Sequence, residues 1–416
     1  MAPETATNRT LPMDELAALA TGRPSDLFEE DLRSHSDAIR QSTDGRRVLV
    51  LGGAGSIGAS TVRALSKFDL ACLHVVDQNE NALAELVRDL RSRPEGLSVL
   101  DFCVLPIDLG SPIMRRHLQT ENPYDLVLNF AALKHVRSEK DVCSVLQMFD
   151  TNLLKPARCW QWIQETGSKA SYFSVSTDKA AEPVNLMGAS KRIMEHMMFS
   201  PEGEMASAKN VTSSRFANVA FSNGSLLESF VQRFEKRQPL AVPRDTYRFF
   251  ISLREAGQIC VLAATCGPDR HIMIPRMDPQ SDARKLEDIA ASFLRYKGLE
   301  PQIYQEEAAA RAGVAKDLLR NRYPLLLTAL DTVGEKSCET FAGQDEQTLE
   351  CGMASILAVR YRPIPGSVLK EFTQTIGRFV SNPDATVGKE DLVAAVARVV
   401  PEFHHLQRFQ TLDQRM

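Results

Sequence analysis

A glycine-rich turn between an apolar run and a helical pattern most strongly constrains the fold of this chain. Residues 46–52 form a short, largely apolar segment ending in Gly52, as expected of a buried strand. Gly55 and Gly58 follow, and residues 59–68 then show a helical pattern. Glycines permit a tight turn and a close approach to a pyrophosphate, which the N–H groups of the helix start can bind. The segment predicts a dinucleotide-binding loop; the alternative is a plain turn.

Strand and helix patterns alternate beyond this loop. Apolar strands that alternate with helices form parallel sheets covered on both faces. We therefore predict an α/β fold with a Rossmann-type doubly wound sheet. The expected strands are 46–52, 72–77, 100–108, 124–132 and 170–178, and the expected helices are 80–93, 140–165 and one that contains 191–199.

Acidic residues end the second and third predicted strands. Asp77 lies 19 residues after Gly58, where a carboxylate accepts hydrogen bonds from the adenosine ribose and disfavours a 2′-phosphate. Residues 78–80 include no arginine, so we predict NAD rather than NADP as the cofactor. The alternative role for Asp77 is a helix N-cap. Asp108 is expected at the adenine edge.

The alternation weakens after about residue 215. Helices are expected at 225–236, 252–265, 283–297 and 389–400 and a strand at 271–275, whereas 302–330 shows no clear pattern. We expect three parts: a flexible tail over 1–25; an NAD-binding domain with a helical lead-in over 26–215; and a smaller, mixed substrate-binding region over 216–416, with room for elements that return to the sheet.

Composition excludes other classes of protein. Hydrophobic residues make up 44% and charged residues 25%, as in soluble globular proteins. The net charge, 49 − 53 = −4, predicts no nucleic-acid partner. No apolar run has the roughly 18 residues of a membrane span, and the start lacks a signal pattern, so we expect a cytoplasmic protein. The eight cysteines form no C-x-x-C pair and are interpreted as reduced core thiols; no metal site is predicted.

Residues 174–192 hold the densest group of reactive side chains. Thr177, Asp178 and Lys179 follow a predicted strand, and Lys191 lies on the next helix, four residues after Met187. At the carboxyl ends of parallel strands, this acid, base and hydroxyl would face the cofactor and suit proton transfer. Alternatively, Thr177 and Asp178 only cap a helix and Lys179 is solvated.

The segment 174–192 (SVSTDKAAEPVNLMGASKR) resembles that of extended short-chain dehydrogenase/reductase proteins, in particular the polysaccharide-biosynthesis UDP-N-acetylglucosamine 4,6-dehydratases. The resemblance spans about 26–300 and resumes near 334–346 and 387–403; it leaves 302–333 and 347–386 without a counterpart. Other matching segments are LGGAGSIGAS (51–60), NFAALKHV (129–136), 215–219, 223–225, 247–250, 274–277, 334–336 and 400–403.

Met187 occupies a position where most short-chain dehydrogenases have tyrosine. A thioether is no useful proton donor or acceptor, yet some 4,6-dehydratases of this group also carry methionine there. Arg137, Ala217 and Asn223 depart from the family pattern on the substrate side, so the sugar stays open.

The resemblance implies a reaction. NAD takes a hydride from C4 of the sugar, a base removes the C5 proton, the C6 hydroxyl leaves as water, and the hydride returns to C6, which gives a 4-keto-6-deoxy sugar. It implies Lys179 as the C5 base, Asp178 as the acid at C6, Thr177 as a partner of the C4 hydroxyl and Lys191 as the holder of the nicotinamide ribose. Since Met187 cannot take the C4 proton, Asp178, Lys179 or a water must do so.

The resemblance also implies the binding residues and a UDP-sugar as ligand, and we expect a homo-oligomer. The alternatives are a structural, hydrogen-bonded role for His135 and a surface ion pair for Arg248. The expected cofactor residues are Gly52, Gly55, Ser56, Ile57, Gly58, Asp77, Asp108, Ala131, Ala132 and Lys191; the expected substrate residues are Lys134, His135, Asn218, Ser225 and Arg248, with 334–336 closing over the nucleotide.

Three other functions stay open at this point. An epimerase or a 4-ketoreductase on the same scaffold usually keeps the tyrosine. A dehydratase that also inverts C5 is compatible with Met187. The third is a non-catalytic NAD-binding sensor. Such a protein would not need Thr177, Asp178, Lys179 and Lys191 together, so their presence as a set argues against it.

Overall fold

The computed structural model describes residues 13–94, 96–134, 139, 141–329 and 339–405. Contacts divide the chain into two units, each assembled from several segments. We call them the sheet unit (Leu27–Ala217, Arg254–Met277 and Asp331–Met416) and the small unit (Met1–Asp26, Asn218–Leu253 and Asp278–Leu330).

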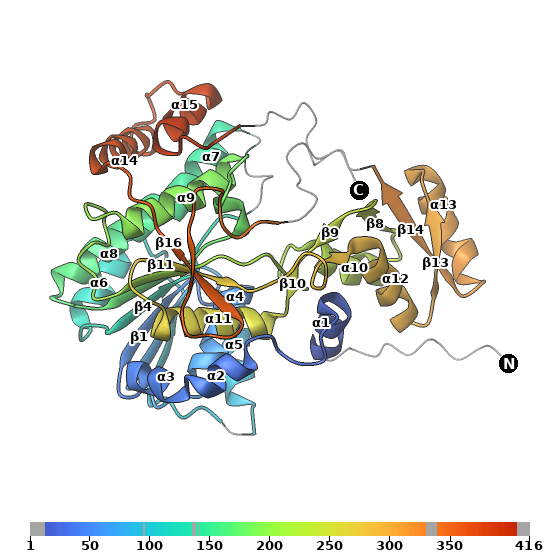
Figure 1. The fold of residues 1–416 in the computed structure, drawn as a ribbon, viewed down its shortest axis with the longest axis horizontal. Coiled ribbons are helices and arrows are strands. Elements are labelled where there is room, and N and C mark those ends of the chain that lie inside the picture. The colour runs from blue at the N-terminus through green and yellow to red at the C-terminus, as the bar shows by residue number, and fades with distance from the viewer. Residues whose placement is uncertain (1–12, 95, 135–138, 140, 330–338, 406–416) are drawn as a thin grey trace. The chain divides into compact units, whose positions relative to one another are not determined.

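A nine-stranded sheet forms the centre of the sheet unit (Figure 1). Its order is β15-β16-β11-β6-β5-β4-β1-β2-β3, and the strands from β3 to β11 are parallel, while β16 and β15 are antiparallel to their neighbours. The chain reverses direction across the sheet between β1 and β4, which confirms the doubly wound α/β fold. The strands are β1 (Arg47–Leu51), β2 (Cys72–Val76), β3 (Asp101–Leu105), β4 (Leu126–Asn129), β5 (Ser171–Val175), β6 (Val211–Ser214), β11 (His271–Pro275), β15 (Thr348–Glu350) and β16 (Ile356–Arg360).

Helices cover both faces of this sheet, which explains why central strands such as β1 are apolar on both sides. One face carries α2 (Glu29–Ser34), α3 (Ser36–Thr43), α4 (Ser56–Leu65), α5 (Glu80–Arg91) and α11 (Leu253–Cys266) (Figure 1). The other carries α6 (Pro112–Thr120), α7 (Val142–Phe149), α8 (Lys155–Glu165) and α9 (Leu186–Phe199), with α14 (Gly366–Ser381) packed on α7 and α15 (Lys389–Val399) on α9.

The predicted helix over 140–165 is not continuous. Residues Asp150–Leu154 form a π-helical turn, η2, between α7 and α8. Such turns are rare and often mark functional sites. The helical lead-in expected at the start of 26–215 is observed as α2 and α3. Asp31, which is 1% exposed, anchors it by accepting the N–H groups of Ala354 (2.6 Å) and Ser355 (2.9 Å).

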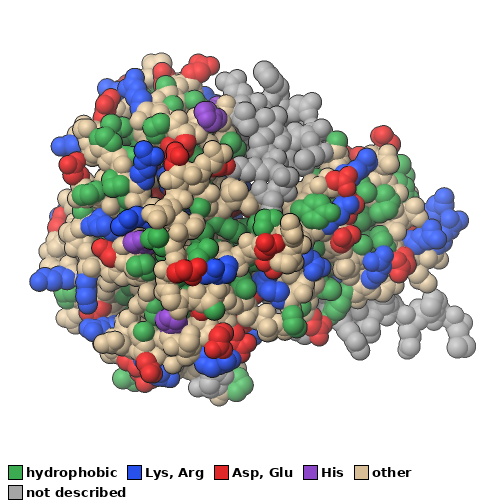
Figure 2. Space-filling model, in the orientation of Figure 1, with side chains coloured by type: hydrophobic (Ala, Val, Ile, Leu, Met, Phe, Trp, Pro, Cys, Tyr) green, Lys and Arg blue, Asp and Glu red, His purple; other side chains and the backbone are tan. Residues whose placement is uncertain are grey.

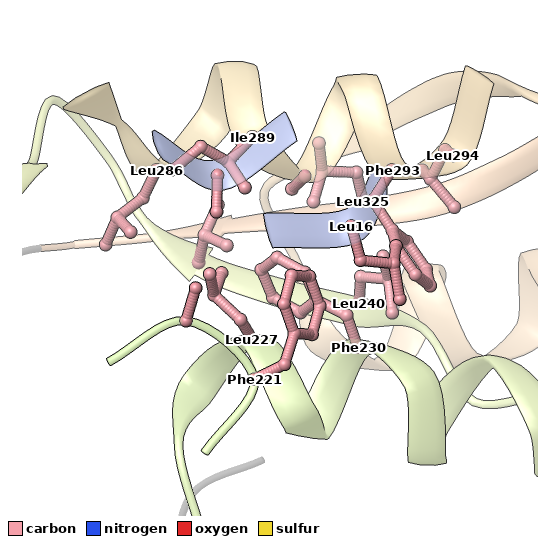
Figure 3. Packing of buried hydrophobic residues seen from close by; sticks show 14 of the residues in the cluster. Leu16, Phe221, Leu227, Phe230, Leu240, Leu286, Ile289, Phe293, Leu294 and Leu325 are labelled. Atoms are coloured by element: carbon pink, nitrogen blue, oxygen red, sulfur yellow. The ribbon is translucent and has the colours of Figure 1, made fainter. Parts of the chain in front are cut away.

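The small unit has its own apolar core around a three-stranded parallel sheet, β13-β14-β8 (Figure 3). The region 302–330 showed no clear pattern; its described residues contribute to a strand–helix–strand unit in this core. The elements are α1 (Met13–Thr21), β7 (Asn218–Val219), α10 (Leu226–Glu235), β8 (Leu240–Pro243), β9 (Tyr247–Arg248), β10 (Phe250–Ile251), β12 (Arg284–Lys285), α12 (Leu286–Tyr296), β13 (Glu300–Tyr304), α13 (Glu307–Leu318) and β14 (Arg322–Thr328).

The predicted flexible tail is wrong for residues 13–21, because α1 packs into this core. Leu16 is 6% exposed and Ala20 is fully buried. Burial of this apolar face against α12 stabilises a helix that is too short to be stable alone. Residues 1–12 lie outside the described part of the chain.

The surface charges and the cysteines match the expectations from composition, with one exception. Basic and acidic side chains are interspersed over the face shown in Figure 2. The described cysteines are all free, and Cys143 is exposed near the start of α7, so the core interpretation is wrong for this residue. No helix within the described ranges combines the length and hydropathy of a membrane span.

Candidate active site

The turn after β1 has a backbone that requires glycine at two positions. Gly52 has a φ of +71°, and a Cβ there would lie 2.4 Å from the backbone nitrogen of Ala131. A Cβ on Gly58 would lie 2.4 Å from the carbonyl oxygen of Gly52. These two glycines therefore let the turn close against the residues after β4 and let α4 start directly beneath it.

Gly55 differs, because packing does not require a glycine there. Its φ is −67°, it is exposed, and a Cβ would meet only the Gly52 carbonyl oxygen at an ordinary 3.6 Å. It is the N-cap of α4, whose first turn includes Ser56 and Ile57, and it offers no side-chain acceptor to that turn. The structure thus leaves room at a helix N-terminus, where N–H groups and the helix dipole favour an anion.

Asp77 directly follows β2, beside this turn. Its carboxylate accepts the N–H groups of Ala54 (3.0 Å) and Asn79 (2.9 Å), one on each oxygen. The N-cap of α5 is Asn79, which accepts the N–H of Ala82, so the N-cap alternative for Asp77 does not apply. A carboxylate has about four acceptor positions, and the remaining ones suit hydroxyl donors.

Asp108 has protein partners for both of its oxygens. One accepts the N–H of Gly110 (2.8 Å), and the other lies 2.5 Å from the Lys155 ammonium. Lys155 comes directly after η2, so this ion pair ties the loop after β3 to the interrupted helix. The role predicted for Asp108 at an adenine edge stays a prediction.

Thr177, Asp178 and Lys179 lie together at the carboxyl end of β5. The Thr177 hydroxyl donates to Oδ1 of Asp178 (2.7 Å), and Nζ of Lys179 lies 3.3 and 3.2 Å from the two carboxylate oxygens. The Asp178 side chain is 8% exposed and that of Lys179 is 42% exposed. Thr177 also caps a short 3₁₀ turn, so capping and clustering occur together. An acid, a base and a hydroxyl thus share one hydrogen-bonded group.

The helix α9 packs closely on this cluster. A Cβ on Gly188 would lie 2.5 Å from the carbonyl oxygen of Lys179, so only glycine permits the contact. Asn185 caps the helix by accepting the N–H of Gly188 (2.8 Å). Next to it, Met187 is 4% exposed, and its N–H donates to Glu139 (2.9 Å). The sequence Asn-Leu-Met-Gly therefore fixes α9 against the residues after β5.

Lys191 is a buried cation on the same helix. It is 6% exposed, and within the described ranges its ammonium has one hydrogen-bond acceptor, the Met194 sulfur at 3.3 Å. Burial lowers the pKa of Lys191 to about 8, although the Glu195 carboxylate acts in the opposite direction. Because a thioether is a weak acceptor, the ammonium keeps donors for a polar ligand.

Asn152 is a positioning residue that the sequence reasoning missed. It lies in η2 and is 1% exposed. Its amide oxygen accepts the N–H of Leu133 (2.8 Å), and its amide nitrogen donates to the Leu133 carbonyl (3.1 Å) and to Ser190 (3.0 Å). It therefore links the segment after β4, which includes Ala131, Ala132 and Lys134, to α9. The sequence offered one signal for this residue: an asparagine inside a predicted helix, where its side chain tends to hydrogen-bond to backbone groups.

The expected substrate residues fall in different parts of the chain. Lys134 is exposed in the sheet unit, and His135 and 334–336 lie outside the described residues. The other three belong to the small unit. There Asn218 donates to the Phe249 carbonyl (3.1 Å), and the Ser225 hydroxyl caps α10 by accepting the N–H of Glu228 (3.1 Å). Arg248 donates to the Tyr247 carbonyl (2.7 Å).

Two groups with metal-ligand chemistry share His74, at the amino-terminal edge of the sheet, away from the glycine turn. They are Cys72, His74 and Asp101, and His74, His117 and Glu121. Both His74 nitrogens are already engaged, by Tyr124 (2.7 Å) and Asp101 (3.1 Å). The Arg47 guanidinium pairs with Asp101 and Glu121, and its positive charge opposes a metal cation. We interpret this cluster as a structural hydrogen-bond network.

The sheet order, the glycine turn and the cluster after β5 define a Rossmann-type protein of the extended short-chain dehydrogenase/reductase class. The chain belongs to the polysaccharide biosynthesis protein family, whose model matches residues 48–359.

Comparisons with individual proteins agree with this family assignment. The chain is similar to the capsular polysaccharide biosynthesis protein CapD of Staphylococcus aureus, with 28% identity over 62% of this chain and 42% of CapD. It is similar to a UDP-N-acetylglucosamine 4,6-dehydratase (inverting) of Campylobacter jejuni, with 27% identity over 51% of this chain and 61% of that enzyme. Proteins named UDP-glucose 4-epimerase, from Rickettsia, also match. The chain thus spans only part of these relatives and is related to nucleotide-sugar dehydratases and epimerases.

Among solved structures, the fold is similar to that of Pen from Bacillus thuringiensis. The TM-score is 0.61 with 19% identity, and the likeness covers 81% of this chain and 98% of that chain. At this identity the likeness concerns the fold alone.

Proposed function

We propose that this protein is an NAD-dependent nucleotide-sugar 4,6-dehydratase that acts on UDP-N-acetylglucosamine or a close relative. The hydrogen-bonded cluster of Thr177, Asp178 and Lys179 at the carboxyl end of β5 carries the proposal. It supplies an acid and a base side by side, which an elimination of water needs. The relationship to UDP-N-acetylglucosamine 4,6-dehydratases supports the choice of substrate.

The residues around the glycine turn fit NAD. The room at Gly55 and the N-terminus of α4 suit a pyrophosphate, and the free acceptor positions of Asp77 suit ribose hydroxyls. Among the described residues, the buried Lys191 ammonium has only the Met194 sulfur as an acceptor, which suits a role in binding the second ribose. NAD, when bound, takes up a hydride from the sugar and returns it later in the same cycle.

Asp178 and Lys179 divide the proton transfers of the elimination. Nζ of Lys179 lies 3.2 Å from the Asp178 carboxylate, so one proton transfer between them yields a neutral amine and a carboxylic acid. The amine takes the C5 proton, and the acid protonates the C6 hydroxyl as it leaves as water. Both groups then have their starting charges. As C6 regains the hydride, the Lys179 ammonium gives a proton to C5, and the proton released by the C4 hydroxyl, which Thr177 bonds, restores the balance.

Met187 favours a dehydratase over an epimerase or ketoreductase. Its thioether cannot exchange a proton with the C4 hydroxyl, so Asp178, Lys179 or a water does so. Burial of Met187 beside the cluster is compatible with a packing role. On the substrate side, we keep Lys134, His135, Asn218, Ser225 and Arg248 as proposed ligands of the nucleotide sugar, because a guanidinium and polar side chains suit a diphosphate.

The test is to incubate the purified protein with UDP-N-acetylglucosamine and identify the product by mass spectrometry and NMR. A dehydratase gives a sugar that has lost one water and carries a C4 ketone. A product of unchanged mass with inverted C4 would identify an epimerase, and NAD binding without conversion of any UDP-sugar would favour a sensor. Asp178→Asn serves as the control, since it should bind NAD but release no dehydrated product.

A further inference from the structure

A buried cluster of four charged side chains adjoins the proposed catalytic residues. Arg192 and Glu195 lie on α9, Arg215 follows β6, and Glu346 comes from the segment before β15. Arg215 and Glu195 are fully buried, and the Glu346 side chain is 3% exposed. Arg215 donates to Glu195 (2.6 and 2.7 Å) and to Glu346 (2.5 Å), and Arg192 also donates to Glu346 (2.5 Å). Glu346 therefore bridges both guanidinium groups.

The cluster connects directly to the residues after β5. The Ser176 hydroxyl donates to Oε1 of Glu195 (2.7 Å), the same oxygen that accepts Nε of Arg215. Ser176 immediately precedes Thr177. A displacement of Glu195 would therefore reach the catalytic cluster through one hydrogen bond and one peptide unit.

The backbone of the segment that carries Glu346 also packs against Ala181, which follows the proposed catalytic residues. The Gly343 N–H donates to Glu346 (2.8 Å), and the Phe341 carbonyl accepts Nη1 of Arg215 (3.0 Å). A Cβ on Gly343 would lie 2.8 Å from the carbonyl oxygen of Ala181, two residues after Lys179. The segment 341–346 is thus packed against the end of the catalytic loop while its glutamate holds the arginines.

Charge balance makes Glu346 necessary to this arrangement. Two arginines face two buried glutamates, with Glu402 an additional, 40% exposed partner of Arg192. Burial alone would disfavour the Glu346 anion, but hydrogen bonds and charge from Arg215, with the charge of Arg192, lower its pKa to about 2. Without that anion, two buried guanidiniums would compete for Glu195, which Ser176 also needs.

We propose that Glu346 is a positioning residue for the catalytic loop: it holds Arg192 and Arg215 so that Glu195 keeps Ser176, and with it Thr177–Lys179, in place. The catalytic part of this inference rests on the proposed function. The structural part does not rest on it: Glu346, 167 residues after Lys179 in the chain (346 − 179), fixes this loop.

Hydrogen exchange read by mass spectrometry tests the structural part. In Glu346→Gln, backbone amides over 174–192 should exchange at least about tenfold faster than in the natural protein, while β2 (72–76) stays unchanged. The matched control is Glu350→Gln, four residues further on in β15, because Glu350 also pairs with an arginine, Arg276 (2.6 Å), but its side chain is 72% exposed; it should change neither region. Unchanged exchange over 174–192, or an equal increase in β2, would overturn the proposal.

Ser176→Ala keeps the test decisive if Glu346→Gln does not fold. It removes the link to Glu195 but leaves the four charges balanced, so the expected result is faster exchange confined to 177–181. If those amides stay as protected as in the natural protein, the proposed link is wrong.

Kinetics then test the catalytic part. Glu346→Gln should lower kcat by about tenfold or more with a smaller change in KM for the sugar, and Glu346→Asp should recover part of kcat. If the natural protein converts no UDP-sugar, the proposed function fails while hydrogen exchange still decides the positioning role. If it turns over normally and Glu346→Gln matches it in kcat, the positioning role fails while the proposed function stands.

Discussion

The ammonium of Lys191 and the hydroxyl of Ser174 converge on one sulfur atom, that of Met194, at 3.3 and 3.2 Å. Ser174 in turn accepts the side-chain amide of Asn129 (3.1 Å) at the end of β4. A buried cation is thus held by a weak acceptor between two strand ends. Burial of a charge without a strong partner costs free energy, and such a cost is typical of a site that a ligand completes.

Replacing Lys191 with methionine should therefore separate stability from function. Lys191→Met removes the buried charge and roughly keeps the volume, so Tm should stay equal or rise, whereas turnover should fall by about 10²-fold or more. Met187→Leu, a volume-conserving swap on the same helix, is the control and should keep measurable turnover. A Met187→Leu protein that binds NAD yet is as inactive as Lys191→Met would contradict the passive role of Met187.

The lowered pKa of Lys191 predicts opposite effects of pH on activity and stability. Turnover should decline above about pH 8 as the ammonium loses its proton. Between about 8 and 10.5 the unfolded chain binds the proton that the folded protein has lost, so this residue's contribution to the free energy of unfolding rises with pH. Chemical denaturation of the natural protein and Lys191→Met at several pH values should show their stability difference shrinking across that window. A constant difference would argue against the shift.

The glycines of the turn predict a contrast between folding and ligand binding. Gly52→Ala should lower Tm, because the positive φ and the 2.4 Å approach to Ala131 leave no room for a Cβ. Gly55→Ala should keep Tm, since its Cβ would make only an ordinary contact, yet it should weaken NAD binding in calorimetry by about tenfold. If Gly55→Ala bound NAD as the natural protein does, the proposed pyrophosphate position would be wrong.

The strands that could be predicted are those whose burial is apolar. β1, β2 and β4 are rich in Val and Leu, and their predicted positions are confirmed. By contrast, β6 was missed because its sequence, Val-Thr-Ser-Ser, is polar although it is buried; its hydroxyls find partners inside the sheet, as Ser213 does with the Ser174 carbonyl (2.7 Å). A buried strand whose polar side chains are hydrogen-bonded shows no hydrophobic pattern in its sequence.

The local part of the candidate site was predictable for a related reason. Thr177, Asp178, Lys179 and Lys191 lie close in sequence, so a strand and the next helix bring them together. The supporting contacts were not predictable, because they depend on chain closure over long separations. Glu346 reaches Arg215 across 131 residues.

Acid should reveal the buried charge cluster. The Glu346 pKa of about 2 lies below its ordinary 4.5, so its contribution to stability is complete above about pH 4.5 and is lost as pH falls toward 2. Glu346→Gln lacks this contribution and leaves Arg192 and Arg215 with Glu195 as their one shared, fully buried carboxylate; complete loss of a partner in a buried ion pair costs about 3–5 kcal/mol, which sets an upper bound here. The stability gap between the two proteins, measured by urea denaturation, should therefore narrow between pH 5 and about pH 2. If the difference in free energy of unfolding stays constant across this pH range, the Glu346 carboxylate does not make the stabilising charge interaction.

Solvent deuterium at C5 of the sugar tests the proposed elimination most directly. The protein is incubated with UDP-N-acetylglucosamine in D₂O, and the product is examined by NMR. With Lys179 as the base and Asp178 as the acid, the natural protein should give a 4-keto-6-deoxy sugar with deuterium at C5, and Lys179→Ala should give neither product nor C5 exchange. A dehydrated product that retains its original C5 hydrogen, or C5 exchange by Lys179→Ala at the natural rate, would contradict this assignment.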